Sequence, residues 1–285
     1  MYAVCGIGGY FLFQKKEVVL IIDLLGYFFA FCIGLIFGLI GAGGSILAVP
    51  VFAYLFGYDE KVATAYSLFV VGSTAVVGAL RQHFKKHVNW KLVFVFGLPA
   101  VAAVSLTRRL LIPALPEIMV QWDQFLLTRR MFIFGLFSTL MIPTALHMLR
   151  SSKQVTVTSI EHLNIPLIVL QGLFIGGLTG LVGVGGGFLI IPALIYLTGI
   201  DMKSAVGTSM AMIAFNALLG FFIGDAMTLS IEWYFLSGFT AVALFGLFLG
   251  TYLSNFFNAY RLKKIFGVFV LLMACFVFVL EFVLV

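Results

Sequence analysis

The chain has 285 residues, of which 62% are apolar and only 10% are charged, and its mean hydropathy is +1.17. Soluble domains carry charges on about 25% of their residues, so this composition excludes a soluble protein. The formal net charge of +6 is assigned to membrane topology and anionic lipid headgroups, which excludes nucleic acid as the partner of the basic residues. We expect a polytopic helical membrane protein.

Apolar runs long enough to cross a bilayer follow one another along the chain. A helix needs about 20 apolar residues to cross a hydrocarbon core about 30 Å thick. Eight runs approach or exceed this length: 18–40, 62–80, 92–112, 131–149, 165–182, 204–224, 233–254 and 265–285. Two shorter apolar pieces, 45–57 and 187–199, each follow a glycine cluster and contain one proline. The sequence therefore predicts eight full spans and two short segments that belong to interrupted helices.

An internal repeat divides the chain into two parts. Residues 38–78 align without gaps on residues 180–220, and 16 of the 41 aligned positions are identical. The identical positions include glycines of both clusters and the proline that follows each cluster. Because internal repeats are a common construction of membrane transporters, we predict two homologous transmembrane halves, 1–150 and 151–285.

The loop charges favour halves of inverted topology. Loop 81–91 carries four Lys and Arg residues, whereas its counterpart 225–232 carries two acids and no basic residue. Basic loops remain in the cytoplasm, so the two loops are expected on opposite sides of the membrane. This arrangement places ten Lys and Arg residues inside and seven outside. Four arginines on the outer side oppose it: Arg108, Arg109, Arg129 and Arg130.

The two glycine clusters are predicted to break helices and to bind an anion. Glycine inside a helix costs about 1 kcal/mol relative to alanine, so each cluster favours a break followed by a new helix N-terminus. Such an end presents free N–H groups and a partial charge of about +0.5, which attracts anions. The alternative is close helix packing through small residues. The expected substrate-binding residues are Gly41, Gly43, Gly44, Ser45, Gly183, Gly185, Gly186 and Gly187, with the hydroxyls of Ser67, Thr208 and Ser209.

The motifs GLIGAGGSILAVPVF and GLVGVGGGFLIIPALIYLTGIDMKSAVGTSM resemble the two signature stretches of the sulfite exporter TauE/SafE family, also called the 4-toluene sulfonate uptake permease group. The resemblance extends over the whole chain, and the second motif is the closer match. It implies a multi-pass carrier of the cell inner (cytoplasmic) membrane for small anions, often sulfur oxyanions or sulfonates. The first copy of the repeat departs from the second at Ser45, Ala65 and Tyr66, which leaves the substrate open.

Few ionisable groups lie within the apolar runs, and each is a functional candidate because its burial in a membrane is costly. Asp23 is considered for proton coupling, with an interfacial or helix-capping position as the alternative. Glu281, near the end of the last apolar run, is expected to reach water. Asp59 and Asp201 are expected to cap the helices that follow them.

The sequence thus predicts a secondary carrier that moves a small anion through the lipid bilayer by alternating access. Two alternatives stay open: an anion channel of the same architecture, and an integral-membrane enzyme acting on a lipid-linked substrate. No catalytic residue set, metal site, cofactor or nucleic-acid partner is expected. The sequence leaves open the exact substrate, the direction of transport, the coupling ion and the oligomeric state.

Overall fold

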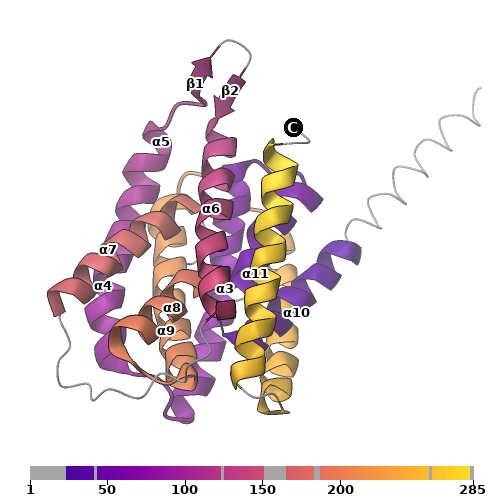
Figure 1. Cartoon of the computed structure of the whole chain (residues 1–285). Coiled ribbons are helices and arrows are strands. Elements are labelled where there is room, and N and C mark those ends of the chain that lie inside the picture. Colours follow the sequence, from indigo (N-terminus) through magenta and orange to yellow (C-terminus); the bar gives the residue numbers. More distant parts are fainter. Residues whose placement is uncertain are drawn as a thin grey trace, which may run out of the picture.

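The computed structural model describes residues 24–41, 44–122, 125–150, 165–182, 187–256 and 259–282. In these parts of the chain the long helices lie side by side in one bundle (Figure 1). Six of the described helices are long and apolar enough to cross a membrane, and three shorter apolar helices accompany them. The chain is therefore an all-α polytopic membrane protein, as the composition predicts. The exact number of membrane crossings stays a prediction.

The helices follow the predicted apolar runs closely. The first part of the chain contains helix Leu24–Ile40, α2 (Gly44–Pro50), the π-helical turn η1 (Val51–Leu55), α3 (Glu60–Phe84), α4 (Trp90–Leu106), the π-helical turn η2 (Thr107–Leu111), α5 (Ile112–Ala114) and α6 (Arg129–Arg150). The second part contains α7 (Ile165–Val182), α8 (Gly187–Thr198), α9 (Met202–Gly220), the π-helical turn η4 (Phe221–Asp225), α10 (Trp233–Leu253), the 3₁₀ turn η5 (Ser254–Phe256) and α11 (Ala259–Phe282).

A two-stranded antiparallel hairpin, which the sequence analysis did not predict, connects α5 to α6. Strand β1 (Ile118–Trp122) pairs with β2 (Phe125–Thr128), and Val120 lies opposite Leu127. The hairpin projects beyond the helices at one end of the bundle (Figure 1). The hairpin lies between the apolar runs that form α4 and α6, so it does not change the predicted order of the helices.

The first glycine cluster interrupts a helix where the sequence predicts a break, and the second lies outside the described residues except for Gly187. The first described helix ends at Ile40 and α2 begins at Gly44, while α7 ends at Val182 and α8 begins at Gly187. The helices that start after the two clusters contact each other across the bundle. Helices α2 and α8, far apart in sequence, thus pack against each other.

Helix α3 packs antiparallel to α9, its counterpart in the repeat. Near the end of α3, Gly78 faces the Met210 side chain, and nearer its middle Gly72 faces Leu218. Just after α3, the Asn89 backbone N–H donates a hydrogen bond of 3.0 Å to Thr208 Oγ1. Antiparallel packing of equivalent helices is what inverted halves require, and the inversion and the division at residue 150 stay predictions.

Small residues bring two further helix pairs into backbone contact. A Cβ at Gly34 or Gly246 would overlap backbone atoms of the partner in the contact between helix Leu24–Ile40 and α10. A Cβ at Gly176 would overlap Ala100 in the contact between α4 and α7. These two contacts are equivalent in the internal repeat, since helix Leu24–Ile40 corresponds to α7 and α10 corresponds to α4. Their glycines serve close helix packing.

Two arginines at the start of α6, which both oppose the inverted topology, form ion pairs with distant carboxylates. Arg129 Nη2 lies 2.7 Å from Glu60 Oε1, and Arg130 Nε lies 3.1 Å from Glu281 Oε1. The expectation that Glu281 reaches water is wrong, because its side chain is fully buried and also accepts a hydrogen bond from the Tyr54 hydroxyl. Glu281 is buried because α11 packs along α6, which supplies the arginine.

We predict that Lys86, just after α3, faces the cytoplasm and that Met227, just after η4, faces outward. The antiparallel packing of α3 on α9 places these two exposed positions at opposite ends of the bundle. Lys86→Cys and Met227→Cys would be introduced separately into a chain without native cysteines and labelled with an impermeant maleimide in intact and inverted vesicles. Labelling of both positions from one side would contradict the arrangement.

Candidate functional site

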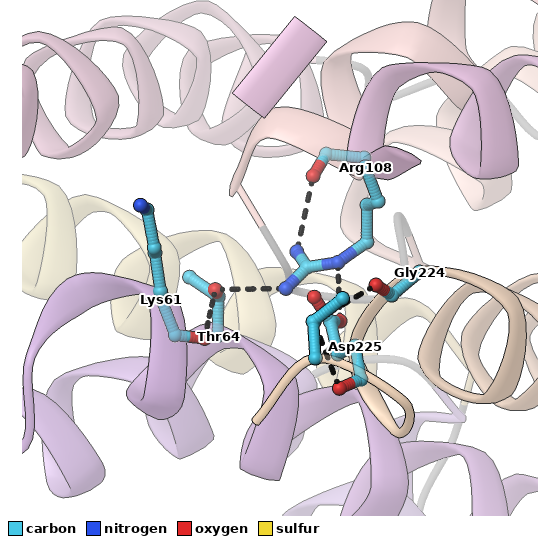
Figure 2. A network of polar contacts seen from close by, with 7 residues as sticks. Lys61, Thr64, Arg108, Gly224 and Asp225 are labelled. Carbon is cyan, nitrogen blue, oxygen red and sulfur yellow. Dashed lines mark hydrogen bonds and ion pairs between the residues drawn. The ribbon is translucent and has the colours of Figure 1, made fainter. Parts of the chain in front are cut away.

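A buried polar cluster lies where α3 begins and α9 ends, and Arg108 is its centre. From η2, the Arg108 guanidinium donates from Nε to Asp225 Oδ2 on η4, at 2.5 Å. Its Nη1 donates to the Gly180 carbonyl of α7 and its Nη2 donates to Thr64 Oγ1 of α3, both at 3.1 Å. Figure 2 shows the guanidinium between Thr64 and Asp225. One side chain thus joins four elements of the bundle.

Local backbone structure brings the two charged residues together. Arg108 and Asp225 both lie on π-helical turns, η2 and η4, which contact each other. Such turns are rare and are frequent at functional sites. A Cβ at Gly224 would approach Arg108 Cβ to 2.8 Å, and a Cβ at Gly180 would approach Thr107 Cβ to 2.9 Å. Glycine at both positions therefore permits η2 to pack closely between α7 and η4.

Next to this ion pair is a cavity of about 760 Å³. Three cationic side chains line it, those of Lys61, Arg108 and Arg109, and one carboxylate, that of Asp225. The remaining lining residues are apolar or small, apart from the Thr228 hydroxyl. Because one carboxylate balances only one of three cations, the cavity has a net positive charge. A small anion is the ligand that this charge distribution favours.

The cluster combines residues of both predicted halves. Arg108 and Thr64 belong to the first half, whereas Asp225 and Gly180 belong to the second. Arg108 is 2% exposed and Asp225 is 8% exposed. Gly180 precedes the second glycine cluster by three residues in the chain. The arginine is therefore bonded directly to the helix that leads into this cluster.

The structure gives packing reasons for two glycines of the first cluster. Gly41 has a φ of +89°, which L residues with a side chain rarely adopt, and a Cβ there would overlap the Val206 side chain. A Cβ at Gly44 would overlap the Ile33 carbonyl, since α2 starts against the helix that precedes it. At these two positions the packing alternative has direct support, and their role in anion binding stays a prediction.

Ser45 and Gly187, which are equivalent in the repeat, lie at the starts of α2 and α8. Both are buried. Helices α2 and α8 contact each other, and a shared anion site at their two N-termini stays a prediction. Five other predicted positions lie outside the described residues: Asp23, Gly43, Gly183, Gly185 and Gly186.

The three predicted hydroxyls have different environments. Ser209 Oγ donates to the Val206 carbonyl of its own helix at 2.9 Å, and Thr208 Oγ1 accepts the hydrogen bond from Asn89 that joins α9 to the loop after α3. Ser67, the repeat equivalent of Ser209, is fully buried, and its Oγ has no hydrogen-bond partner among the described residues. A buried hydroxyl without a partner is costly, so Ser67 is the strongest candidate of the three for contact with a ligand.

The expected capping role is confirmed for Asp201. Its Oδ2 accepts hydrogen bonds from the Lys203 and Ser204 backbone N–H groups at 3.1 and 3.2 Å. Burial acts to raise the pKa of Asp201, but these hydrogen bonds hold it below its ordinary value. Asp59 occupies the same position before α3, without a side-chain bond to the N–H groups of the first turn. Both aspartates thus stand at helix starts.

Sequence reasoning missed the pair of Arg108 and Asp225. Both were treated as loop charges in the topology argument, although Arg108 lies inside the predicted span 92–112. An arginine within a span is itself a functional signal, because a buried cation requires a partner. The identity of that partner could not be read from the chain, since 117 residues separate the two.

Comparisons with known proteins agree with this architecture. The family model described as sulfite exporter TauE/SafE matches residues 27–277. A probable membrane transporter protein of Xylella fastidiosa is 28% identical over 252 residues, which cover 86% of this chain and 90% of that protein. The probable membrane transporter protein YjnA of Bacillus subtilis is 24% identical over 245 residues, 86% of this chain and 93% of that protein. No solved structure matches the chain significantly. The chain belongs to the sulfite exporter TauE/SafE family.

We predict that Thr64→Val destabilises the protein by about 1–3 kcal/mol, because it leaves a buried Arg108 N–H group without its acceptor. Thr74→Val is the matched control on the same helix, since among the described residues the Thr74 hydroxyl bonds to the Val70 and Val71 carbonyls of its own helix. Unfolding of both variants in detergent would be followed by circular dichroism. Equal losses of stability would show that Thr64 contributes nothing through Arg108.

Proposed function

We propose that this member of the TauE/SafE family is a secondary carrier that moves a small anion, a sulfur oxyanion or a sulfonate, across the cytoplasmic membrane. The family and the multi-pass helical fold support transport as the activity. The description of the family as sulfite exporters supports the sulfur chemistry of the substrate. The direction of transport does not follow from either.

The observation that carries the proposal is the cavity beside Arg108. Lys61, Arg108 and Arg109 outnumber the single carboxylate of Asp225 there. A cation excess in a concave site between low-dielectric walls raises the local concentration of anions. A volume of about 760 Å³ admits a small sulfonate or oxyanion together with water. The cavity suits entry of an anion toward the interior of the bundle.

Farther inside, we propose that the starts of α2 and α8 hold the anion through their backbone N–H groups. The residues proposed for this role are those of the two glycine clusters, Gly41, Gly43, Gly44, Ser45, Gly183, Gly185, Gly186 and Gly187. The break of the helix at Gly41, the start of α8 at Gly187 and the contact of α2 with α8 support it. Ser67 would add a hydroxyl donor, and Thr208 and Ser209 would support the surrounding helix.

Transport by alternating access would follow from rocking of two inverted halves, 1–150 and 151–285, about this region. The antiparallel contact between α3 and α9, with an Arg108 cluster at one end and Thr208 at the other, supports such a motion. The alternatives make different demands. An anion channel needs a continuous water path, whereas an enzyme acting on a lipid-linked substrate needs a catalytic group.

We predict that the purified protein in proteoliposomes takes up radiolabelled sulfite with a saturable rate and shows counterflow when the vesicles contain unlabelled sulfite. Both properties follow from a site that faces one side at a time. Uptake of thiosulfate, methanesulfonate and acetate would be measured in parallel to define the class of anion. Single-channel currents in planar bilayers would favour the channel, and the absence of flux for all four anions would contradict the carrier.

We predict that Ser67→Ala weakens anion binding about fivefold, while Ser209→Ala leaves it unchanged. The Ser67 hydroxyl is buried without a partner, so its removal costs a ligand contact and no internal hydrogen bond. The Ser209 hydroxyl already donates to Val206 and serves as the matched control from the other half. Affinity would be measured by scintillation proximity with the anion that the flux assay selects. Equal effects of the two substitutions would remove Ser67 from the site.

A further inference from the structure

The ion pair between Arg108 and Asp225 leaves part of the hydrogen-bonding capacity of the arginine unused by the described residues. Arg108 uses three of the five guanidinium N–H groups for described partners, and it lines the cavity. Its acceptors are one carboxylate oxygen, one carbonyl and one hydroxyl. Two N–H groups of Arg108 therefore have no partner among the described residues. The guanidinium that carries them lines the cavity.

A carboxylate and a small oxyanion are equivalent ligands for a guanidinium. Arginine binds carboxylate, phosphate and similar oxyanions through the same fork of N–H donors. We propose that Arg108 is a binding residue for the transported oxyanion and that Asp225 occupies its place while the cavity is empty. The inference rests on the proposed function, since it assumes that the cavity admits the anion.

The replacement of Asp225 by the oxyanion is favourable because Arg108 is paired with an anion in both states. Removal of the partner from a buried arginine is strongly unfavourable, since it leaves a buried charge uncompensated. An incoming oxyanion supplies a new partner as Asp225 leaves. Lys61 and Arg109 line the same cavity and attract the anion toward this point. The Arg108 cation is thus paired with an anion before and after the exchange, and Lys61 in the lining of the same cavity supplies a cation for the displaced Asp225 carboxylate.

The exchange also separates the two halves at one end of the bundle. Asp225 on η4 holds η2 of the other half through Arg108. At the opposite end of the contact between α3 and α9, the described link is a neutral hydrogen bond from Asn89 to Thr208. An anion can compete with the first link but not with the second. The empty carrier is therefore held at the Arg108 end, and occupancy by the anion releases it.

A substitution at Asp225 distinguishes this role from a purely structural one. Asp225→Asn keeps the shape of the side chain and removes the competing charge, so it is expected to bind the anion at least tenfold more tightly than the natural chain. A structural ion pair would give unchanged or weaker binding. Arg108→Gln is expected to lower the affinity by at least a hundredfold. Arg108→Lys keeps a cation for Asp225 but loses the fork of donors, and is expected to bind at least tenfold more weakly.

Glu60→Gln is the matched control. Glu60 is the carboxylate of a second buried arginine pair, with Arg129, and it does not line the cavity. It is expected to lower the melting temperature as much as Asp225→Asn and to leave anion affinity unchanged. Saturating anion should restore the melting temperature of Asp225→Asn and not that of Glu60→Gln, because only the first variant has an arginine that the anion can satisfy.

The experiment uses purified, monodisperse protein in detergent. Sulfite, sulfate, thiosulfate, methanesulfonate and acetate are screened by thermal shift, and the anion with the largest shift becomes the probe for calorimetric titration of every variant. Tighter binding by Asp225→Asn, with loss in Arg108→Gln, supports the proposal. Wild-type affinity in either variant overturns it and leaves the proposed function standing. If Asp225→Asn does not remain monodisperse, Arg108→Lys decides, since unchanged affinity there overturns the proposal. Failure of all five anions to bind the natural chain overturns both.

Discussion

The cost of an unsatisfied polar group in hydrocarbon governs this structure. Backbone amides and charges inside a bilayer must find partners within the protein. The long helices satisfy their own backbone, and the first described helix ends just before Gly41, which packs against Val206 of α9. The same constraint acts on side chains, because each arginine within the bundle that forms an ion pair does so with a carboxylate from a distant element.

Glycine has two separate uses in this fold. At Gly34, Gly176 and Gly246 it allows helices to approach until backbone meets backbone, which is the main packing device available where lipid removes the hydrophobic drive between helices. At Gly41 it supplies a backbone conformation that ends a helix. The end of the helix at Gly41 allows α2 to start a few residues later, at the position to which we assign the anion. Close packing and anion binding therefore both depend on glycine in this part of the fold.

Among the described residues, three arginine–carboxylate pairs lie toward the start of α3, and the pair of Arg108 and Asp225 borders a cavity with excess positive charge. A buried ion pair contributes little net stability compared with apolar packing, because desolvation offsets most of the attraction. Its partners can, however, be exchanged for a ligand of the same charge. Arg108 and Asp225 are therefore better suited to a moving interface than a group of apolar side chains in the same place.

The sequence by itself determined that the chain is a membrane protein, the order of its helices, the first interruption and the family, because each follows from local composition and from motifs within one stretch of chain. It did not determine which charges meet. Glu281 was expected in water and is buried against Arg130, while Arg108 and Asp225 were counted as loop charges. Likewise Ser67 and Ser209 are identical in the repeat, yet only Ser209 has a described partner. These differences depend on contacts between distant helices, which the tertiary structure alone decides.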